Sequence, residues 1–217
     1  MIRCETVYGS LLERHGPQDW WPASDAFEVI VGALLVQRTS WASVEDAIGL
    51  LRQHGLLSPD ELHRAPLDLV ETCIRSVGFH RTKAARLRAL AGFVRDLGGV
   101  AAFAQVDTPA LRRTLLGLEG VGPETADAIL LYAFDRPAVV VDEYLRRLVK
   151  RLTAAATADT DLRCWVSRDL AGDVDRLNEL HALVVAHGRE TCSPIPHCSG
   201  CVLLTACRTG IGGGSDA

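Results

Sequence analysis

The chain has 217 residues, 48% of them hydrophobic, which is enough for one globular body or two small lobes with a core. Its net charge of −4 does not mark it as a nucleic-acid-binding protein, and no apolar run is long enough to span a membrane. No signal peptide is visible, so we expect a cytoplasmic protein with reduced thiols. In that compartment the seven cysteines favour metal binding over disulfides.

Apolar residues recur at helical spacing along most of the chain, which predicts an all-α fold. Residues 27–36 form a continuous apolar run that suits a buried helix. Ser58 and Thr108 each precede a proline, and we expect their hydroxyls to cap helices that begin there. Residues 138–141 are compatible with a short strand, although no second segment pairs with them. The glycine-rich tail, residues 210–217, is expected to be disordered.

A helical hairpin with a glycine turn is predicted for residues 116–129. Gly120 and Gly122 can adopt backbone conformations that are closed to other residues, and Val121 between them can anchor the turn in the core. Pro123 suits the first position of the second helix. Free N–H groups at that helix start could accept a phosphate oxygen, although ordinary helical hairpins also use glycine turns.

Asp142 follows a run of three valines, residues 139–141, about twenty residues after the hairpin turn. An aspartate at this place can cap the helix that we expect over residues 143–152. A carboxylate at a helix start can also take part in catalysis, and the two roles are compatible. The residues alone are compatible with the capping role and with the catalytic role of Asp142.

Four of the seven cysteines lie within 16 residues near the end of the chain. Such a group can hold an iron–sulfur cluster or a structural zinc. Zinc sites usually have two separate Cys-x-x-Cys pairs, whereas this chain has one, so the spacing favours a cubane cluster. The remaining three cysteines, Cys4, Cys73 and Cys164, are expected to act as small buried hydrophobic residues. The candidate ligands are Cys192, Cys198, Cys201 and Cys207.

The hairpin, the aspartate and the four cysteines, in this order, resemble the helix-hairpin-helix DNA glycosylase superfamily, and within it the endonuclease III family, over roughly residues 27–207. Residues 37–39 resemble the family's glutamine-bearing loop, 78–84 its second helix start, and 187–192 its lead-in to the cluster. The resemblance implies a six-helix barrel lobe over 24–136, with the hairpin at 111–134. It also implies an iron–sulfur lobe, formed by 1–23 and 137–209, that holds a 4Fe–4S cluster. The implied DNA-contacting residues are Gln37, Arg81, Lys83, Gly120, Val121, Gly122, Glu124 and Thr125, with Gln37 filling the gap left by a flipped base.

The resemblance also indicates a chemistry. In bifunctional members a lysine that forms an imine with the sugar stands at the position occupied here by Glu124. A carboxylate cannot form an imine, so we expect no lyase activity. The resemblance leaves Asp142 as the catalytic group, which stabilises positive charge on the deoxyribose or activates water.

The sequence further resembles the alkylpurine branch of this family. The adenine-mismatch branch has a glutamate where this chain has Ala33. In the alkylpurine branch, tandem aromatic residues and an aromatic after the glutamine loop line the base pocket. We read the tandem tryptophans here as helical, and core packing is the competing role for them. The implied pocket residues are Trp20, Trp21, Pro22 and Trp41.

We therefore expect a monomeric, monofunctional enzyme, associated with the nucleoid through its substrate, that releases 3-methyladenine and 7-methylguanine from damaged double-stranded DNA. One alternative is an endonuclease III-like glycosylase for oxidised pyrimidines that also has lyase activity. The other is a DNA-binding iron–sulfur protein without catalytic activity.

Overall fold

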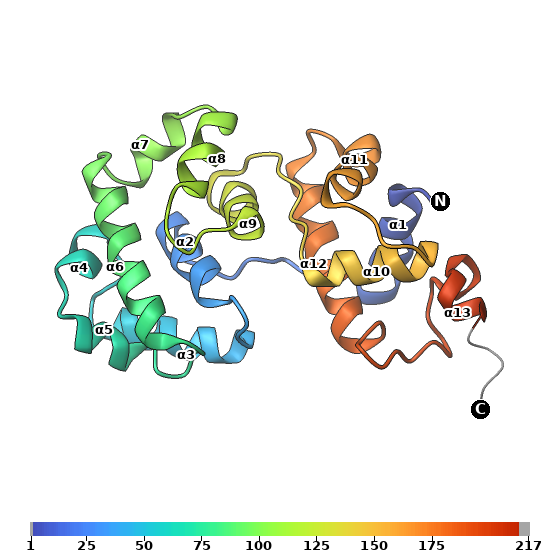
Figure 1. Cartoon of the computed structure of the whole chain (residues 1–217), viewed down its shortest axis with the longest axis horizontal. Helices are drawn as coiled ribbons and strands as arrows, with labels where there is room; N and C mark the ends of the chain where they lie inside the picture. Colours follow the sequence, from blue (N-terminus) through green and yellow to red (C-terminus); the bar gives the residue numbers. More distant parts are fainter. Residues whose placement is uncertain (1, 213–217) are drawn as a thin grey trace. The chain divides into compact units, whose positions relative to one another are not determined.

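The computed structural model describes residues 2–212, and this part of the chain is helical without a strand, which confirms the predicted all-α fold (Figure 1). The first half contains α1 (Cys4–His15), α2 (Ala26–Leu35), α3 (Trp41–Gln53), α4 (Pro59–Arg64), α5 (Leu67–Cys73), α6 (His80–Asp96) and α7 (Val100–Gln105). The second half contains α8 (Thr108–Leu116), α9 (Pro123–Phe134), α10 (Glu143–Thr153), α11 (Asp159–Leu170), α12 (Val174–Glu190), the short 3-10 helix η1 (Leu204–Ala206) and α13 (Arg208–Gly212). None of these helices is both long and apolar enough to cross a membrane.

The described chain divides into two compact units. One is Trp21–Arg136, which contains α2 to α9. The other combines residues 2–20 with residues 137–212, so it is built from both ends of the chain.

Helix α2 is the centre of the Trp21–Arg136 unit. It is apolar on all sides, and nine of its ten residues are buried, as the apolar run predicts. It packs against α3, α6 and α9, while α4 and α5 pack on α6 (Figure 1). A helix surrounded in this way determines the positions of the helices around it and of the loop that follows its carboxyl end.

The predicted caps were right at one helix and wrong at the other. The Ser58 hydroxyl accepts a hydrogen bond from the Glu61 N–H at 3.2 Å at the start of α4. At α8 the cap is Asp107, whose carboxylate accepts from the Ala110 N–H at 3.0 Å, and Thr108 is already the first helical residue. The aspartate one residue earlier has the extended backbone that a cap requires.

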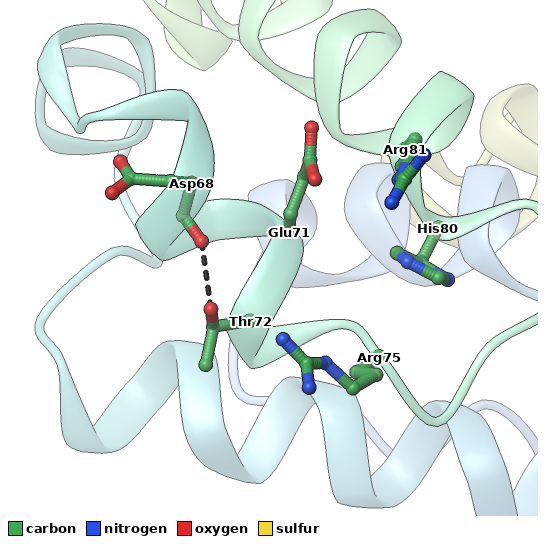
Figure 2. A pocket seen from close by; sticks show the side chains of 6 residues that line it. All are labelled: Asp68, Glu71, Thr72, Arg75, His80 and Arg81. Carbon is green, nitrogen blue, oxygen red and sulfur yellow. Dashed lines mark hydrogen bonds between the residues drawn. The ribbon is translucent and has the colours of Figure 1, made fainter.

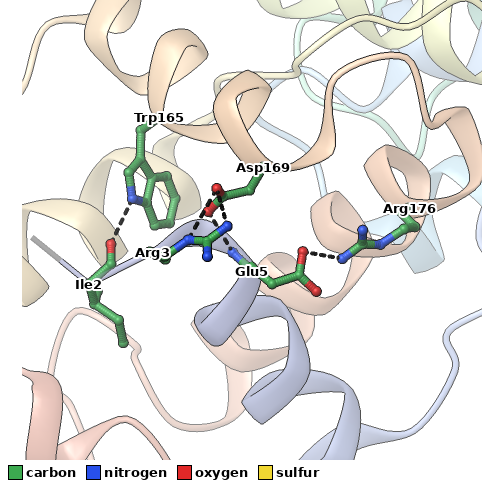
Figure 3. Close-up of polar contacts among 6 residues, drawn as sticks. All are labelled: Ile2, Arg3, Glu5, Trp165, Asp169 and Arg176. Carbon is green, nitrogen blue, oxygen red and sulfur yellow. Dashed lines mark hydrogen bonds and ion pairs between the residues drawn. The ribbon is translucent and has the colours of Figure 1, made fainter.

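In the second unit, α1 packs against α11 and α12. Figure 3 shows the polar contacts that attach the start of the chain to this pair. The Trp165 indole N–H donates to the Ile2 carbonyl at 2.9 Å, and the Arg3 guanidinium donates to Asp169 at 2.8 Å. These contacts give Trp165 a structural role that the sequence did not indicate.

Two expected local features differ in the structure. Residues 138–141 form no strand, because no neighbouring segment pairs with them. Of the tail expected to be disordered, residues 210–212 belong to α13, and residues 213–217 lie outside the described part of the chain.

Candidate functional site

The predicted hairpin is formed by α8, a turn over residues 117–122, and α9. Gly120 has φ +84°, a conformation that favours glycine, and a Cβ there would displace the flexible end of the Arg86 side chain, whose Cδ atom would lie 2.5 Å away. Val121 is buried and anchors the turn, as expected. Gly122 was expected to need a special conformation, which is wrong, because its φ of −88° is open to any residue.

The glutamine loop docks on this turn. The Gln37 amide donates to the Gly120 carbonyl and to the Thr125 hydroxyl, both at 2.9 Å. The structure thus brings together three of the residues predicted to contact DNA, with Gln37 more than 80 positions from the other two in the sequence.

Lys83 was predicted to contact DNA, and the structure shows its ammonium bonded to acceptors inside the protein. Its side chain is buried with 3% exposure, and its ammonium donates to three acceptors inside the protein, the carbonyls of Leu35 and Gln37 and the Thr39 hydroxyl. Burial lowers the pKa of Lys83 to about 8. All three protons are used within the fold, so none is directed to a phosphate.

Arg81, by contrast, is exposed. It lines a surface pocket of about 380 Å³ together with Arg75 and His80, and Asp68 and Glu71 line the same pocket from α5 (Figure 2). The pocket carries charges of both signs, which weakens the attraction that its arginines alone would have for a phosphate.

Residues 72–95 contain no acidic side chain but six arginines and lysines, and several of these have partners within the protein. Arg86 lies 3.5 Å from a Glu119 carboxylate oxygen, and Arg88 donates to the His63 carbonyl. Arg95 pairs with Asp96 at 2.6 Å. The cations of this segment are therefore not all directed to solvent.

Two of the predicted pocket residues form an aromatic group. The rings of Trp21 and Trp41 meet edge to face with centroids 5.1 Å apart, and the Tyr132 ring of α9 is tilted against Trp21 at 5.3 Å. A Cβ at position 32 would lie 3.0 Å from the Trp21 ring, so Gly32 lets the indole lie directly on α2. All three rings are partly exposed, and Pro22 beside them is exposed.

The tandem tryptophans were expected on a helix, and this is wrong. They lie in the non-helical segment between α1 and α2. Trp20 is the last residue of one unit and Trp21 the first of the other.

Asp142 occupies the cap position of α10 in the second unit. One carboxylate oxygen accepts from the Leu145 N–H at 2.7 Å, and the other lies 3.6 Å from the His181 Nε2 atom on α12. The residue is buried, with 6% exposure. A buried carboxylate that accepts a hydrogen bond from a backbone N–H has a fixed direction, which electrostatic stabilisation of a nearby positive charge requires.

The four clustered cysteines line one cavity, together with apolar side chains that include Leu148, Leu152 and Leu203. Among residues 2–212, no three side chains of the ligand types His, Cys, Asp and Glu are placed to hold a metal ion. Four thiols lining one cavity are the ligand set that a cubane cluster or a structural zinc ion requires.

Hydrogen-bond donors approach these sulfurs. The Arg151 guanidinium lies 3.1 Å from the Cys192 sulfur, and the Gly210 N–H donates to the Cys207 sulfur at 3.4 Å. Such donors stabilise thiolates, the form that binds metal. Arg151 also donates to the carbonyls of Ser193 and Pro194 and so holds the short loop after the first cysteine. This donor set fits an iron–sulfur cluster.

Residues 31–164 match the family described as the HhH-GPD superfamily of base excision DNA repair proteins. The chain belongs to this superfamily. It is 39% identical over 207 residues to a Methanocaldococcus jannaschii protein that is named as a DNA repair glycosylase, which covers 93% of this chain and 94% of that protein. It is 30% identical over 188 residues to endonuclease III of Sulfolobus acidocaldarius, covering 85% and 82%.

Solved structures share the fold of this HhH-GPD protein. An endonuclease III trapped in a covalent complex with DNA superposes with a TM-score of 0.81 at 23% identity, covering 98% of this chain and 99% of that one. The 3-methyladenine DNA glycosylase of H. pylori, bound to 1,N6-ethenoadenine, gives 0.77 at 24% identity, covering 87% and 98%. Membership in the superfamily makes this protein a DNA glycosylase of base excision repair. The comparisons include both the alkylpurine and the endonuclease III branch.

Three candidate residues of this HhH-GPD protein were not predicted from the sequence. His181 and Tyr132 contact their partners only because helices pack together, and no spacing in the sequence indicates these contacts. Phe79 is 68% exposed and has a positive φ of 58°, next to Gly78, whose position faces the glutamine loop. The glycine before it and the basic residues after it were visible signals of an exposed turn.

The double role of Asp142 makes a prediction about stability. Changing Asp142 to Ala removes the cap of α10, and we expect a loss of about 0.5–2 kcal/mol in the free energy of unfolding, measured with urea. Asp142→Asn keeps a capping oxygen and should cost much less. Asp173, the cap of α12, gives the matched control, because Asp173→Ala should cost a similar amount without affecting the site. Equal losses for Asp142→Ala and Asp142→Asn would contradict the capping role.

Proposed function

We propose that this enzyme is a monofunctional DNA glycosylase that hydrolyses the N-glycosidic bond of alkylated purines, above all 3-methyladenine and 7-methylguanine. The observation that carries the proposal is the aromatic group of Trp21, Trp41 and Tyr132. A purine methylated at N3 or N7 is a flat cation. Aromatic faces attract such a cation by about 0.5–2 kcal/mol per good contact.

The charge of the base also decides which catalyst is needed. A cationic purine leaves readily as a neutral base, so little acid catalysis is required. Positive charge then develops on the deoxyribose, and the buried Asp142 carboxylate is the group that we assign to stabilise it or to activate water. His181, 3.6 Å from one Asp142 oxygen, helps to keep that carboxylate in place.

Contact with the DNA backbone is assigned to the hairpin, whose α9 begins with Gly122 and Pro123 and offers free N–H groups to a phosphate. Gln37 is assigned to fill the gap left by the flipped base. To do so its amide exchanges the Gly120 carbonyl and the Thr125 hydroxyl for groups of the DNA. The exposed Phe79 ring can stack on a neighbouring base.

The absence of lyase activity is proposed from the lysine content. Glu124 is exposed in the first turn of α9, at the position of the imine-forming lysine in bifunctional members. The chain has only two lysines. Lys83 is buried with its three protons bonded, and Lys150 lies on α10 outside the motif.

The four clustered cysteines are proposed to bind a 4Fe–4S cluster that stabilises this end of the chain without taking part in bond cleavage. Their shared cavity and the donors at two of their sulfurs support this assignment. We further propose that the enzyme acts as a monomer on double-stranded DNA in the cytoplasm.

We expect the wild type to release methylated purines from N-methylated duplex DNA, measured by chromatography of free bases under single-turnover conditions. Asp142→Asn should lower the release rate at least a thousandfold while the dissociation constant for abasic duplex changes less than threefold, because the cap and the fold remain. Trp41→Ala should lower the rate for methylated purines more than tenfold. No release of either methylated base by the wild type would contradict the proposal.

Identity of 30% to endonuclease III of Bacillus subtilis and of S. acidocaldarius favours a second candidate, removal of oxidised pyrimidines with strand cleavage. We expect borohydride to trap no covalent adduct on duplexes containing thymine glycol or an abasic site. An adduct that persists in Lys83→Arg and disappears in Lys150→Arg would support this candidate, with Lys150 as the amine. Tight binding of abasic duplex without turnover on any damaged base would instead indicate an inactive DNA-binding protein.

The cluster makes a separate prediction. Protein purified without oxygen should be brown, absorb broadly near 400 nm and contain about four iron atoms per chain. Cys201→Ser should lower the iron content and the melting temperature, while Cys164→Ser, which changes an exposed cysteine outside the group, should alter neither. One zinc atom per chain in place of iron would show a structural zinc site.

A further inference from the structure

Lys83 is a buried lysine that no step of the proposed reaction uses. Its ammonium lies 2.8 Å from the Leu35 carbonyl, 2.7 Å from the Gln37 carbonyl and 2.9 Å from the Thr39 hydroxyl. Three donors thus meet three acceptors, and all three acceptors lie at the end of α2 or in the loop that follows it. We call residues 36–39 the Gln37 loop.

A cation suits this place for two reasons. The carbonyls at the carboxyl end of a helix have no partners within the helix, and they carry the negative end of the helix dipole. The loop also contains Arg38 with a positive φ of 53°, a conformation that costs free energy for a residue with a side chain. Hydrogen bonds on both sides of Arg38, at Gln37 and Thr39, hold the chain in this conformation.

The same loop reaches the hairpin through its glutamine. The Gln37 backbone carbonyl accepts from Lys83, while its side-chain amide donates to Gly120 and Thr125. The position of the amide on the hairpin therefore depends on a backbone that Lys83 fixes.

Helix α6 contacts the hairpin directly as well. Arg86 lies three residues, about one turn, after Lys83, and its side chain fills the space beside Gly120 and approaches Glu119. One face of α6 thus supports the Gln37 loop at Lys83 and the turn of the hairpin at Arg86.

We propose that Lys83 is a positioning residue that holds the Gln37 loop in register with the hairpin, so that the enzyme presents both to DNA as one preformed unit. This rests on the proposed function for its effect on base release, but the hold on the loop is a property of the free protein. Without the ammonium, the strained loop would relax, and ordering it again on DNA would slow the flipping of the base.

The first arm of the test measures hydrogen exchange in the free protein. In Lys83→Met, which keeps the length of the side chain and removes its donors, we expect peptides covering residues 36–40 to exchange at least tenfold faster than in the wild type. Lys150→Met is the matched control, since it removes the only other lysine, which is exposed, and it should change nothing there. Unchanged exchange at residues 36–40 in Lys83→Met would overturn the proposal.

The second arm measures single-turnover base release and abasic duplex binding. Lys83→Met should release base at least tenfold more slowly than the wild type at a temperature where both are folded. If Lys83 acts through the loop, the losses in Lys83→Met and Gln37→Ala should not be additive in the double variant. Fully additive losses, or a Lys83→Met rate within twofold of the wild type, would show a merely structural role and overturn the proposal.

Lys83→Gln supplies a second variant if Lys83→Met does not fold. Its uncharged amide has two N–H donors for the three acceptors that Lys83 satisfies, so peptides covering residues 36–40 should exchange faster than in the wild type while α9 is unchanged. Lys83→Arg keeps a charged donor group and should exchange more slowly than Lys83→Gln. Equal exchange at residues 36–40 in the wild type and Lys83→Gln would overturn the proposal.

The two proposals fail in different ways. A wild type that releases no methylated base contradicts the proposed substrate, while the exchange measurements still decide whether Lys83 holds the loop. Unchanged protection of residues 36–40 in Lys83→Met and in Lys83→Gln would overturn the role of Lys83, whatever the substrate is.

Discussion

Three hydrogen bonds from one buried ammonium hold the end of α2 and the Gln37 loop of the Trp21–Arg136 unit in place. Lys83 binds the carbonyl end of α2 and the loop that follows it, and that loop binds the hairpin through Gln37. Burying a charge is costly unless it is paired or fully hydrogen-bonded, and here three acceptors meet the three protons. The hairpin, the loop and α6 therefore keep one arrangement before DNA is present.

The functions proposed for the chain are divided between its two units. The aromatic group and the hairpin belong to Trp21–Arg136, whereas Asp142 and the cysteines belong to the unit made from both chain ends. Recognition of a flat cationic base needs rings held by packing, as Gly32 allows for Trp21. Stabilising a cationic sugar needs a fixed carboxylate, which the cap of α10 supplies. Each requirement is met by local structure within one unit.

Arginines illustrate why charge patterns are weak predictors of binding surfaces. Arg86 and Arg88 belong to a segment without acidic residues, yet Arg86 approaches Glu119 of the hairpin turn and Arg88 donates to the His63 carbonyl. Arg151 of α10 holds the loop after Cys192 and approaches its sulfur. A cation that satisfies carbonyl groups of a loop contributes order to that loop, and its charge is then less available to a phosphate.

The sequence by itself determined the helical class, the buried helix α2, the hairpin with Val121 as its anchor, and the superfamily, because these follow from local periodicity, glycine positions and motif order. Only the tertiary structure decided that Lys83 is internal, that Tyr132 joins the tryptophans, and that His181 faces Asp142. These pairs join residues from 39 to 111 positions apart, and no pattern within a helix encodes which face of another helix it will meet. The role of a side chain depends on the residues that it contacts, and the packing of the helices determines those contacts.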